Sequence, residues 1–450
     1  MPETPIAGYL TNQVGARKGS CDNTSPLRCV DMKVFGVSQS DLNRLTGRDW
    51  LWLGLICSFG LGSVAIQMAW VLALFGGYLF WRKGTVLIDP SLRQMWFWLG
   101  CLAVPALCSI FDSAVMDRSA RTLLRMMSFG LAAVVLIQMP PSATALRKIT
   151  IGVALATGFF CLDGILQKFF GHNIIGNPLW SDQFSPARIT GFLGLNYAWV
   201  LMVLSPWLFE GCRLLDGRGL AYWVAIPLLF VAVILGGSRA SGLLLVISVL
   251  TYATLIGVRL GISASVKFAV PVFASLLASV VMLASNPELG DRWLAMMGAL
   301  PGGAGDTAEI LSWRPYLWDA AIALFLEHPI NGVGARAFGV SSETLLAGYG
   351  VADRIPGAAY NWSPHLSVLE VAADLGTIGL LGYAILLTTL VRWLINAPMS
   401  AIAPGLTALM ALFPLGSTLP LFSARVSAVA WLAIAAALAF AKVATHSQRQ

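Results

Sequence analysis

Apolar runs long enough to cross a lipid bilayer recur along nearly the whole sequence, and they constrain the fold more than any other feature. A helix needs roughly 20 mainly apolar residues to cross a hydrocarbon core of about 30 Å. Of the 450 residues, 57% are apolar and only 11% are charged, which suits a bilayer rather than water. The sequence therefore predicts an all-α, polytopic transmembrane helix bundle of about 12 spans. The expected spans are 51–65, 66–82, 95–112, 121–139, 147–169, 189–210, 219–236, 240–258, 266–285, 370–393, 398–416 and 420–442.

The distribution of Lys and Arg gives this bundle a direction. Cytoplasmic connections of membrane proteins carry an excess of positive residues. With the amino terminus inside, every inner connection holds at least one Lys or Arg. The first two spans share one apolar stretch that divides near Gly60–Gly62, so eleven spans is the alternative count. The net charge of +7 follows from this topology, and the scattered basic residues do not indicate nucleic acid as a partner.

The expected segments follow from these spans. Residues 1–50 form a polar cytoplasmic tail, expected to be partly disordered and without a secretory signal peptide. Residues 51–285 hold nine spans, 286–369 form one large outward loop, 370–442 hold three spans and 443–450 form a second cytoplasmic tail. Within the loop, Pro315 suits the first turn of a helix and Pro329 ends it, which predicts a helix over 315–327. That helix is apolar nearly all round, so we expect it to be buried or to lie in the membrane interface.

Arg239 is the sharpest candidate for a functional charge. It lies in GGSRASG between two apolar runs, with almost no connection around it. A turn this short holds the guanidinium at the outer edge of the membrane, where a charge is costly and is a functional candidate by default. The alternative is an interfacial anchor whose side chain reaches toward water.

Two further arginines share the expected outer surface. Arg188 lies in SPARITG directly before a span, and Arg314 begins the helix of the large loop. Several arginines at one interface, with no matching run of carboxylates, suit a fixed anion such as a lipid-linked phosphate or pyrophosphate. A guanidinium grips phosphate oxygens in a two-pronged fork that a lysine cannot reproduce. The alternative for each arginine taken separately is an ordinary loop residue.

His365, in NWSPHLSVLE, lies where the chain re-enters the membrane after the large loop. Its ordinary pKa near 6.5 makes a histidine at such an edge a candidate general base, although a lone histidine is more often structural. Glu370 is five residues away and so does not stack on His365 as a helical orienting partner would. Glu370, Asp163 and Arg336 are secondary site candidates.

Several kinds of chemistry lack their sequence signals. The outward segments contain no DxD, HxH or HExxH pattern, so no metal site is expected. None of the seven cysteines forms a CxxC pair or lies in the large loop, which argues against a disulfide framework or a zinc site. There is no Walker motif and no GxSxG, which disfavours a nucleotide site and a nucleophile-elbow hydrolase. No cofactor is expected.

With these residues in view, the chain resembles the O-antigen ligase and polymerase superfamily of bacterial envelope enzymes. Three segments carry the resemblance in order across residues 185–392. They are GGSRASG, WRPYLWDAAIALFLEHPINGVGARAFG and NWSPHLSVLEVAADLGTIGLLGY. Members of this family often have Asn after the histidine of the third segment, where this chain has Leu366.

The resemblance implies an O-antigen ligase of lipopolysaccharide biosynthesis in the bacterial inner membrane, with both termini cytoplasmic and the active face periplasmic. Such an enzyme transfers a glycan from undecaprenyl pyrophosphate to a sugar hydroxyl of the lipid A–core oligosaccharide, without a metal and by inversion if no covalent intermediate forms. His365 would act as the base, and Arg239, Arg188 and Arg314 would surround the pyrophosphate. The alternatives are an O-antigen polymerase with the same donor, a protein O-glycosylating relative, and a lipid-linked oligosaccharide flippase or transporter.

Overall fold

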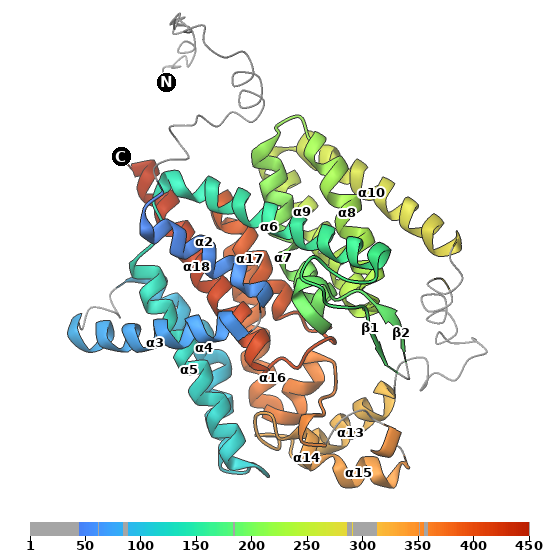
Figure 1. Cartoon of the computed structure of the whole chain (residues 1–450). Helices are drawn as coiled ribbons and strands as arrows, with labels where there is room; N and C mark the ends of the chain where they lie inside the picture. The colour runs from blue at the N-terminus through green and yellow to red at the C-terminus, as the bar shows by residue number, and fades with distance from the viewer. Residues whose placement is uncertain are drawn as a thin grey trace, which may run out of the picture. The chain divides into compact units, whose positions relative to one another are not determined.

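The computed structural model describes residues 45–61, 63–83, 89–182, 185–285, 290, 313–350, 352–354 and 359–449, and helices dominate them (Figure 1). The expected cytoplasmic tail over residues 1–44 and most of the first part of the large loop lie outside the described residues. The amino-terminal helices are α2 (Gly47–Cys57), α3 (Ser63–Lys83), α4 (Pro90–Ile110), α5 (Met116–Gln138) and α6 (Ala143–Phe170). The middle helices are α7 (Tyr197–Leu215), α8 (Leu220–Leu235), α9 (Arg239–Leu260) and α10 (Ile262–Ser285).

The carboxy-terminal part begins with the loop helices α13 (Arg314–Glu327), α14 (Phe338–Ser341) and α15 (Glu343–Gly348), and α13 begins one residue before the helix expected at 315–327. The helices α16 (Ser367–Asn396), α17 (Ile402–Ala411) and α18 (Ala424–Arg449) follow. Short 3-10 turns are η2 (Ser58–Leu61), η4 (Gly191–Asn196), η5 (Ala352–Arg354), η6 (Ala359–Asn361) and η7 (Met399–Ala401). Among the described residues, the only strands are β1 (Trp180–Asp182) and β2 (Ser185–Arg188), an antiparallel hairpin.

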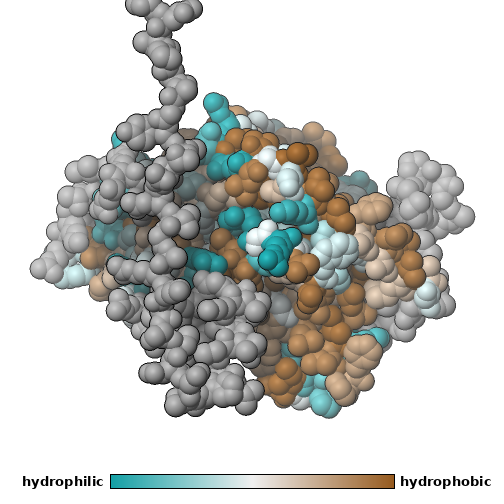
Figure 2. Space-filling model, turned by 90° about the horizontal axis from the view of Figure 1, so that it is seen from above, coloured by the Kyte–Doolittle hydropathy of each residue, from teal (hydrophilic) through white to brown (hydrophobic). Residues whose placement is uncertain are grey.

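Seven helical segments in the described part of the chain are long and apolar enough to cross a membrane. They are Met116–Gln138, Ala143–Phe170, Gly191–Leu215, Arg239–Leu260, Ile262–Ser285, Ser367–Asn396 and Ala424–His446, and three shorter apolar helices accompany them. Large apolar side chains also face outward, among them Trp70, Leu74, Phe273 and Val280. Figure 2 shows apolar residues over much of one face of the molecule. The chain is therefore an all-α polytopic membrane protein.

The centre of the bundle is formed by α7, α17 and α18, with α17 packed against both of the others. The spanning window is 83% buried in α18 and 78% buried in the segment ending with α7, against 28% in α10. The sequence of α18 explains its central place, because small side chains let helix backbones approach closely inside a membrane. Its fully buried residues include Ala428, Ala430, Ala433 and Ala436.

The span expected at 398–416 is shorter in the structure. The 3-10 turn η7 and helix α17 together cover Met399–Ala411, and residues 412–423 form the connection to α18, called here the connecting loop. Pro414 and Pro420 explain this early end, because a proline lacks the backbone donor that a continuing helix needs. The connecting loop is the element that organises the site described below.

The long helix α16 breaks at Gly376, whose φ of +63° and ψ of −157° are not helical. The break is held by the segment after α13, because the Val333 and Gly334 amides donate to the Ala373 and Asp374 carbonyls and the Thr377 amide donates to Pro329. A Cβ at Gly376 would lie 2.3 Å from the Ile330 carbonyl oxygen. Irregular backbone within a span is tolerated where other protein groups satisfy it in this way.

Candidate active site

Arg239 is placed by a capped turn between α8 and α9. Gly237 turns the chain with φ +67°, and the Ser238 hydroxyl accepts a hydrogen bond from the Ser241 amide at the start of α9. The Thr418 hydroxyl of the connecting loop lies 3.4 Å from the Ser238 hydroxyl and 3.2 Å from that of Ser241. The turn that carries Arg239 is thus fixed to the connecting loop.

Arg314 approaches the same loop from the first residue of α13. Its guanidinium donates to the Ser417 hydroxyl at 3.4 Å. Burial and the positive charge of Arg239 both lower the pKa of Arg314, so the two guanidiniums lie within electrostatic reach of one another. The preceding residue, Trp313, adopts a left-handed φ of +62°, and this angle sets the direction in which the chain enters α13.

His365 completes this group of residues. The Trp318 indole donates to the Pro364 carbonyl at 3.0 Å, and the Ser367 amide donates to Gly416 of the connecting loop at 2.9 Å. Between these anchors, His365 has a φ of +49°. Residues other than glycine rarely adopt this backbone angle, and those that do cluster at functional sites. Arg239, Arg314 and His365, all brought to the Ser417–Thr418 stretch, are called the His365 cluster below.

The imidazole of His365 is poised to accept a proton. Its Nδ1 atom is enclosed and has no hydrogen-bond partner within the described structure. Burial and the charge of Arg314 lower the pKa of His365 to about 4, while a hydrogen bond to the Ser417 backbone opposes the shift. Because Nδ1 is unpartnered, we infer that this hydrogen bond is made by Nε2, which leaves the lone pair on Nδ1. The ring is therefore neutral at pH 7 with its basic nitrogen unoccupied.

Arg188 has a different location. It ends β2, paired with Trp180 of β1, and its guanidinium carbon lies 5.7 Å from the centre of the Trp180 ring. The structure thus brings Arg239, Arg314 and His365 to the Ser417–Thr418 stretch and places Arg188 on the β1–β2 hairpin.

The acidic candidates organise loops. The carboxylate of Asp163 accepts hydrogen bonds from the Ile174 and Phe192 amides, and it is fully buried. That of Glu370 accepts from the Leu421 and Phe422 amides of the connecting loop. A buried carboxylate held by two backbone amides fixes the path of the chain. Among the described residues, no group of three or more His, Cys, Asp and Glu could hold a metal ion.

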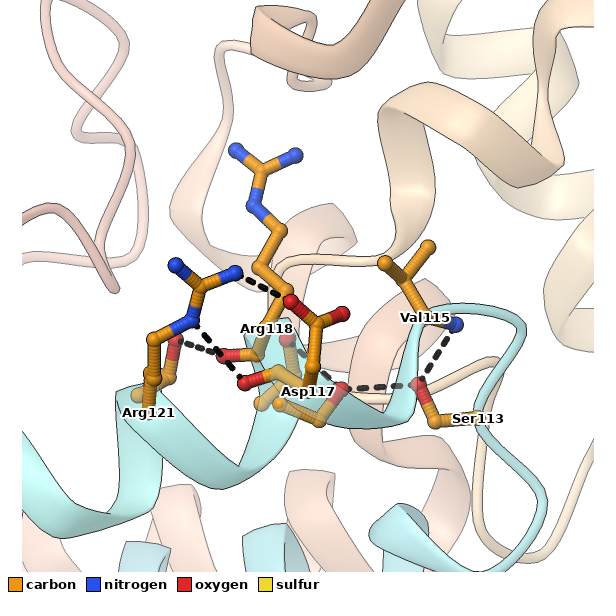
Figure 3. Close-up of polar contacts among 8 residues, drawn as sticks. Ser113, Val115, Asp117, Arg118 and Arg121 are labelled. Carbon is orange, nitrogen blue, oxygen red and sulfur yellow. Dashed lines mark hydrogen bonds and ion pairs between the residues drawn. The ribbon is translucent and has the colours of Figure 1, made fainter.

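A second basic region escaped the sequence analysis. Arg118, Arg121 and Arg125 project from one face of α5 and, with Arg336, line a pocket of about 290 Å³, called here the arginine pocket. Figure 3 shows the Arg118 and Arg121 side chains leaving the first turns of α5, with Arg121 paired to Asp117. Spacings of three and four residues put side chains on one helix face. That periodicity in the first turns of an apolar span is the signal that could have revealed them.

An apolar groove of about 550 Å³ runs between the second halves of α9 and α16 and the end of α17. Its lining comes from α9, α16 and the end of α17, and includes Leu250, Leu387 and Leu409. Phe413 and Pro414 of the connecting loop also line it, and Pro414 is three residues before Ser417. The groove therefore reaches the connecting loop that carries Ser417.

Comparisons with known proteins found one family model that is similar to part of this chain. No curated protein and no solved structure matches the chain. A family model described as O-antigen ligase matches residues 224–384, a range that contains Arg239, Arg314 and His365 together with Arg336. Over this region the chain is similar to the O-antigen ligase family, and the match supports membership of the O-antigen ligase/polymerase superfamily.

Proposed function

We propose that this protein is an O-antigen ligase, a glycosyltransferase that moves a glycan from undecaprenyl pyrophosphate to a sugar hydroxyl of the lipid A–core oligosaccharide. The observation that carries the proposal is the unpartnered Nδ1 of His365 beside two neighbouring guanidiniums. The family match supports the same reaction class. Such a transfer needs one group to take a proton and fixed positive charge to stabilise a departing pyrophosphate.

The reaction then proceeds as a direct displacement. The acceptor hydroxyl attacks the anomeric carbon as its proton passes to Nδ1 of His365. The new carbon–oxygen bond forms while the bond from that carbon to the pyrophosphate oxygen breaks, and the leaving group keeps the electron pair. Arg239 and Arg314 stabilise the negative charge that develops there, with Arg188 proposed as a further pyrophosphate ligand from the β1–β2 hairpin. A single displacement inverts the anomeric centre.

The low pKa of His365 in the free protein fits this scheme. The positive charge of Arg314 opposes protonation of the imidazole. A bound pyrophosphate brings negative charge to Arg314 and offsets that repulsion, which raises the basicity of His365 when the donor is present. The base is thereby strengthened in the complex that needs it. This coupling also gives the pH dependence argued in the Discussion.

The donor lipid has a place in the same arrangement. We assign its polyprenyl tail to the apolar groove between α9, α16 and α17, because that groove ends at Phe413 and Pro414 beside the connecting loop. A hydrocarbon chain in the groove would place the pyrophosphate near Ser417. The headgroup and tail would then occupy polar and apolar surfaces that adjoin one another, as an amphipathic lipid requires.

The direction of the protein in the membrane follows from the two ends of α9. Its first residue, Arg239, lies in the His365 cluster, while Arg259 in its last turn donates to carbonyls at the end of α16, including that of Leu394. The amino ends of α9 and α16 thus share one side, and their carboxy ends share the other. Positive residues favour the cytoplasm, so we propose cytoplasmic termini and a periplasmic active face in the inner membrane.

Reconstitution of the purified protein tests the function. The protein is mixed with undecaprenyl-pyrophosphate glycan and lipid A–core in the presence of EDTA, and products are separated by gel electrophoresis. A glycan joined to lipid A–core is the expected product. A glycan lengthened on its own lipid would make the protein a polymerase, and donor movement across vesicles without any product would make it a transporter. His328→Ala, at an exposed histidine after α13, serves as the matched control for His365→Ala.

A further inference from the structure

The arginine pocket concentrates positive charge that the chain itself neutralises only in part. Its lining contains four arginines and no carboxylate among the described residues. Asp117 pairs with Arg121 at the exposed rim, where both side chains are about two-thirds exposed. Such a pair contributes little and is readily exchanged for another anion.

The buried carboxylates near the pocket are already occupied. Those of Glu370 and Asp374 each accept two backbone hydrogen bonds, the latter from the Arg336 and Phe338 amides at 2.6 and 3.0 Å. They fix the walls of the pocket, and within the described structure they form no ion pair with its guanidiniums. The Glu370 and Asp374 carboxylates are thus occupied by backbone amides, and the guanidiniums of the four arginines line the cavity.

The individual side chains show how the pocket is held open. Arg118 donates to the Tyr360 carbonyl and stacks on the Tyr360 ring at 3.7 Å from its centre. Arg125 donates through one terminal nitrogen to the Phe422 carbonyl at 2.8 Å, while its Nε is enclosed without a partner in the described part of the chain. Arg336 has a left-handed φ of +66°, as Trp313 and His365 of the neighbouring site also do. Strained backbone of this kind marks sites that bind or react.

We propose that the arginine pocket binds a phosphate group carried by the acceptor lipid. Several guanidiniums around one cavity suit a phosphate, whose charge is about −1.5 to −2 at neutral pH and whose oxygens match the arginine fork. Tyr360 and Asn361 line the same pocket, and their hydroxyl and amide groups can hydrogen-bond to a sugar that bears the phosphate. This inference rests on the proposed function.

The connecting loop explains why the ligand belongs to the acceptor and not to the donor. Ser417 contacts the His365 cluster, and Phe422 contacts Arg125 of the arginine pocket. Five residues extend at most about 18 Å, so the two sites lie close together, and the lining of the arginine pocket includes no residue of the His365 cluster. The donor carries one pyrophosphate, which the His365 cluster accommodates. A second anion site at this separation therefore serves the other substrate.

Binding of the acceptor without donor tests the proposal, because it needs no turnover. The full-length protein in phosphatidylcholine vesicles is titrated with lipid A–core, either intact or dephosphorylated. The variants are Arg121→Gln/Arg336→Gln and the control Arg218→Gln/Arg392→Gln, which removes two exposed arginines far along the chain from the pocket. Thermal unfolding identifies any variant that fails to fold, and Arg121→Gln alone is then used. A parallel series adds phosphatidylglycerol to the vesicles.

We expect the unmodified protein and the control to bind the phosphorylated acceptor about 10-fold to 100-fold more tightly than the dephosphorylated one. The pocket variant should bind both forms equally weakly. Equal losses for both forms, or a variant that still discriminates, would overturn the proposal. So would competition by phosphatidylglycerol with no effect of dephosphorylation, since the pocket would then hold a bilayer headgroup. Discrimination without any transfer product would instead refute only the proposed function.

Discussion

The His365 cluster and the arginine pocket contact the same connecting loop, at Ser417–Thr418 and at Phe422, yet they are built differently. The cluster combines two arginines with a neutral imidazole whose Nδ1 is unoccupied, whereas the pocket is lined by four arginines and no histidine. A proton acceptor beside positive charge can both activate a hydroxyl and stabilise a leaving group. Positive charge without a proton acceptor can hold an anion but cannot activate a hydroxyl. The comparison therefore supports the proposal that the cluster is the site of chemistry and the pocket a site that positions a substrate.

The largest effect is expected from the proton acceptor. His365→Ala should lower kcat by about 10²- to 10⁴-fold, because general base catalysis contributes a factor of that size. Donor binding should change little, since the arginines remain. Initial rates and donor titrations measure the two quantities, with His328→Ala as control. Full activity of His365→Ala would remove the distinction between the two sites.

Loss of a guanidinium from the cluster should cost somewhat less. Arg314→Gln and Arg239→Gln are each expected to lower kcat by about 10²- to 10³-fold, the usual cost of one group that stabilises transition-state charge. Arg314→Lys should recover only part of the rate, because an ammonium keeps the charge but not the fork. Single-turnover rates with saturating donor report the step directly. A lysine variant with the full rate would show that charge alone suffices.

The pH profile distinguishes free and donor-bound protein. Burial and Arg314 place the pKa of His365 at about 4, so the free protein keeps the base neutral above that pH. The acid limb of kcat/KM should therefore fall near pH 4, and that of kcat should lie at higher pH because the bound pyrophosphate offsets Arg314. Arg314→Gln should move the kcat/KM limb upward, since it removes a charge that opposes protonation. Coincident limbs in both proteins would argue against this coupling.

A substitution at Glu370 tests whether the connecting loop supports both the His365 cluster and the arginine pocket. Its carboxylate accepts the Leu421 and Phe422 amides, and Glu370→Gln would set an amide donor against one of these amide donors. We expect a loss of about 1–3 kcal/mol in stability and weaker binding of donor and acceptor together. Thermal unfolding and separate titrations check this, with Glu343→Gln on the exposed side of α15 as control. A loss confined to one substrate would show that the loop positions only one site.

The same comparison shows what the sequence alone could predict. Arg239, Arg314 and His365 each lie at a helix start beside a short turn or a proline, so local signals single them out. Their convergence depends on Ser417 and Thr418, which the expected spans 398–416 and 420–442 leave in a very short connection, whereas the structure places them in the longer connecting loop. Only Pro414 and Pro420 hint that α17 ends early, and hydropathy averages over both.

The residues that sequence reasoning missed share a physical cause. Arg118, Arg121 and Arg125 lie in the first turns of an apolar helix, where a count of Lys and Arg in the connections between spans does not single them out. The break at Gly376 also has no clear sequence signal, because the distant segment 329–334 stabilises it and the glycine itself is the one local residue that favours it. Asp163 and Glu370 are conspicuous in the sequence, but their amide partners are 11 to 52 residues away. Long-range hydrogen bonds determine the roles of Gly376, Asp163 and Glu370, and local sequence patterns do not encode those bonds.

The smallest expected effect concerns the rim of the arginine pocket. Asp117→Asn removes the partner of Arg121, and both side chains are about two-thirds exposed, so stability should change by less than about 1 kcal/mol. If the pocket takes a phosphate, releasing Arg121 should leave acceptor binding unchanged or slightly tighter, and kcat should stay as it is. Denaturation and acceptor titration measure the two quantities. Weaker acceptor binding would mean that Asp117 orients Arg121 for the ligand, and the rim pair would then be part of the site instead of a competitor for it.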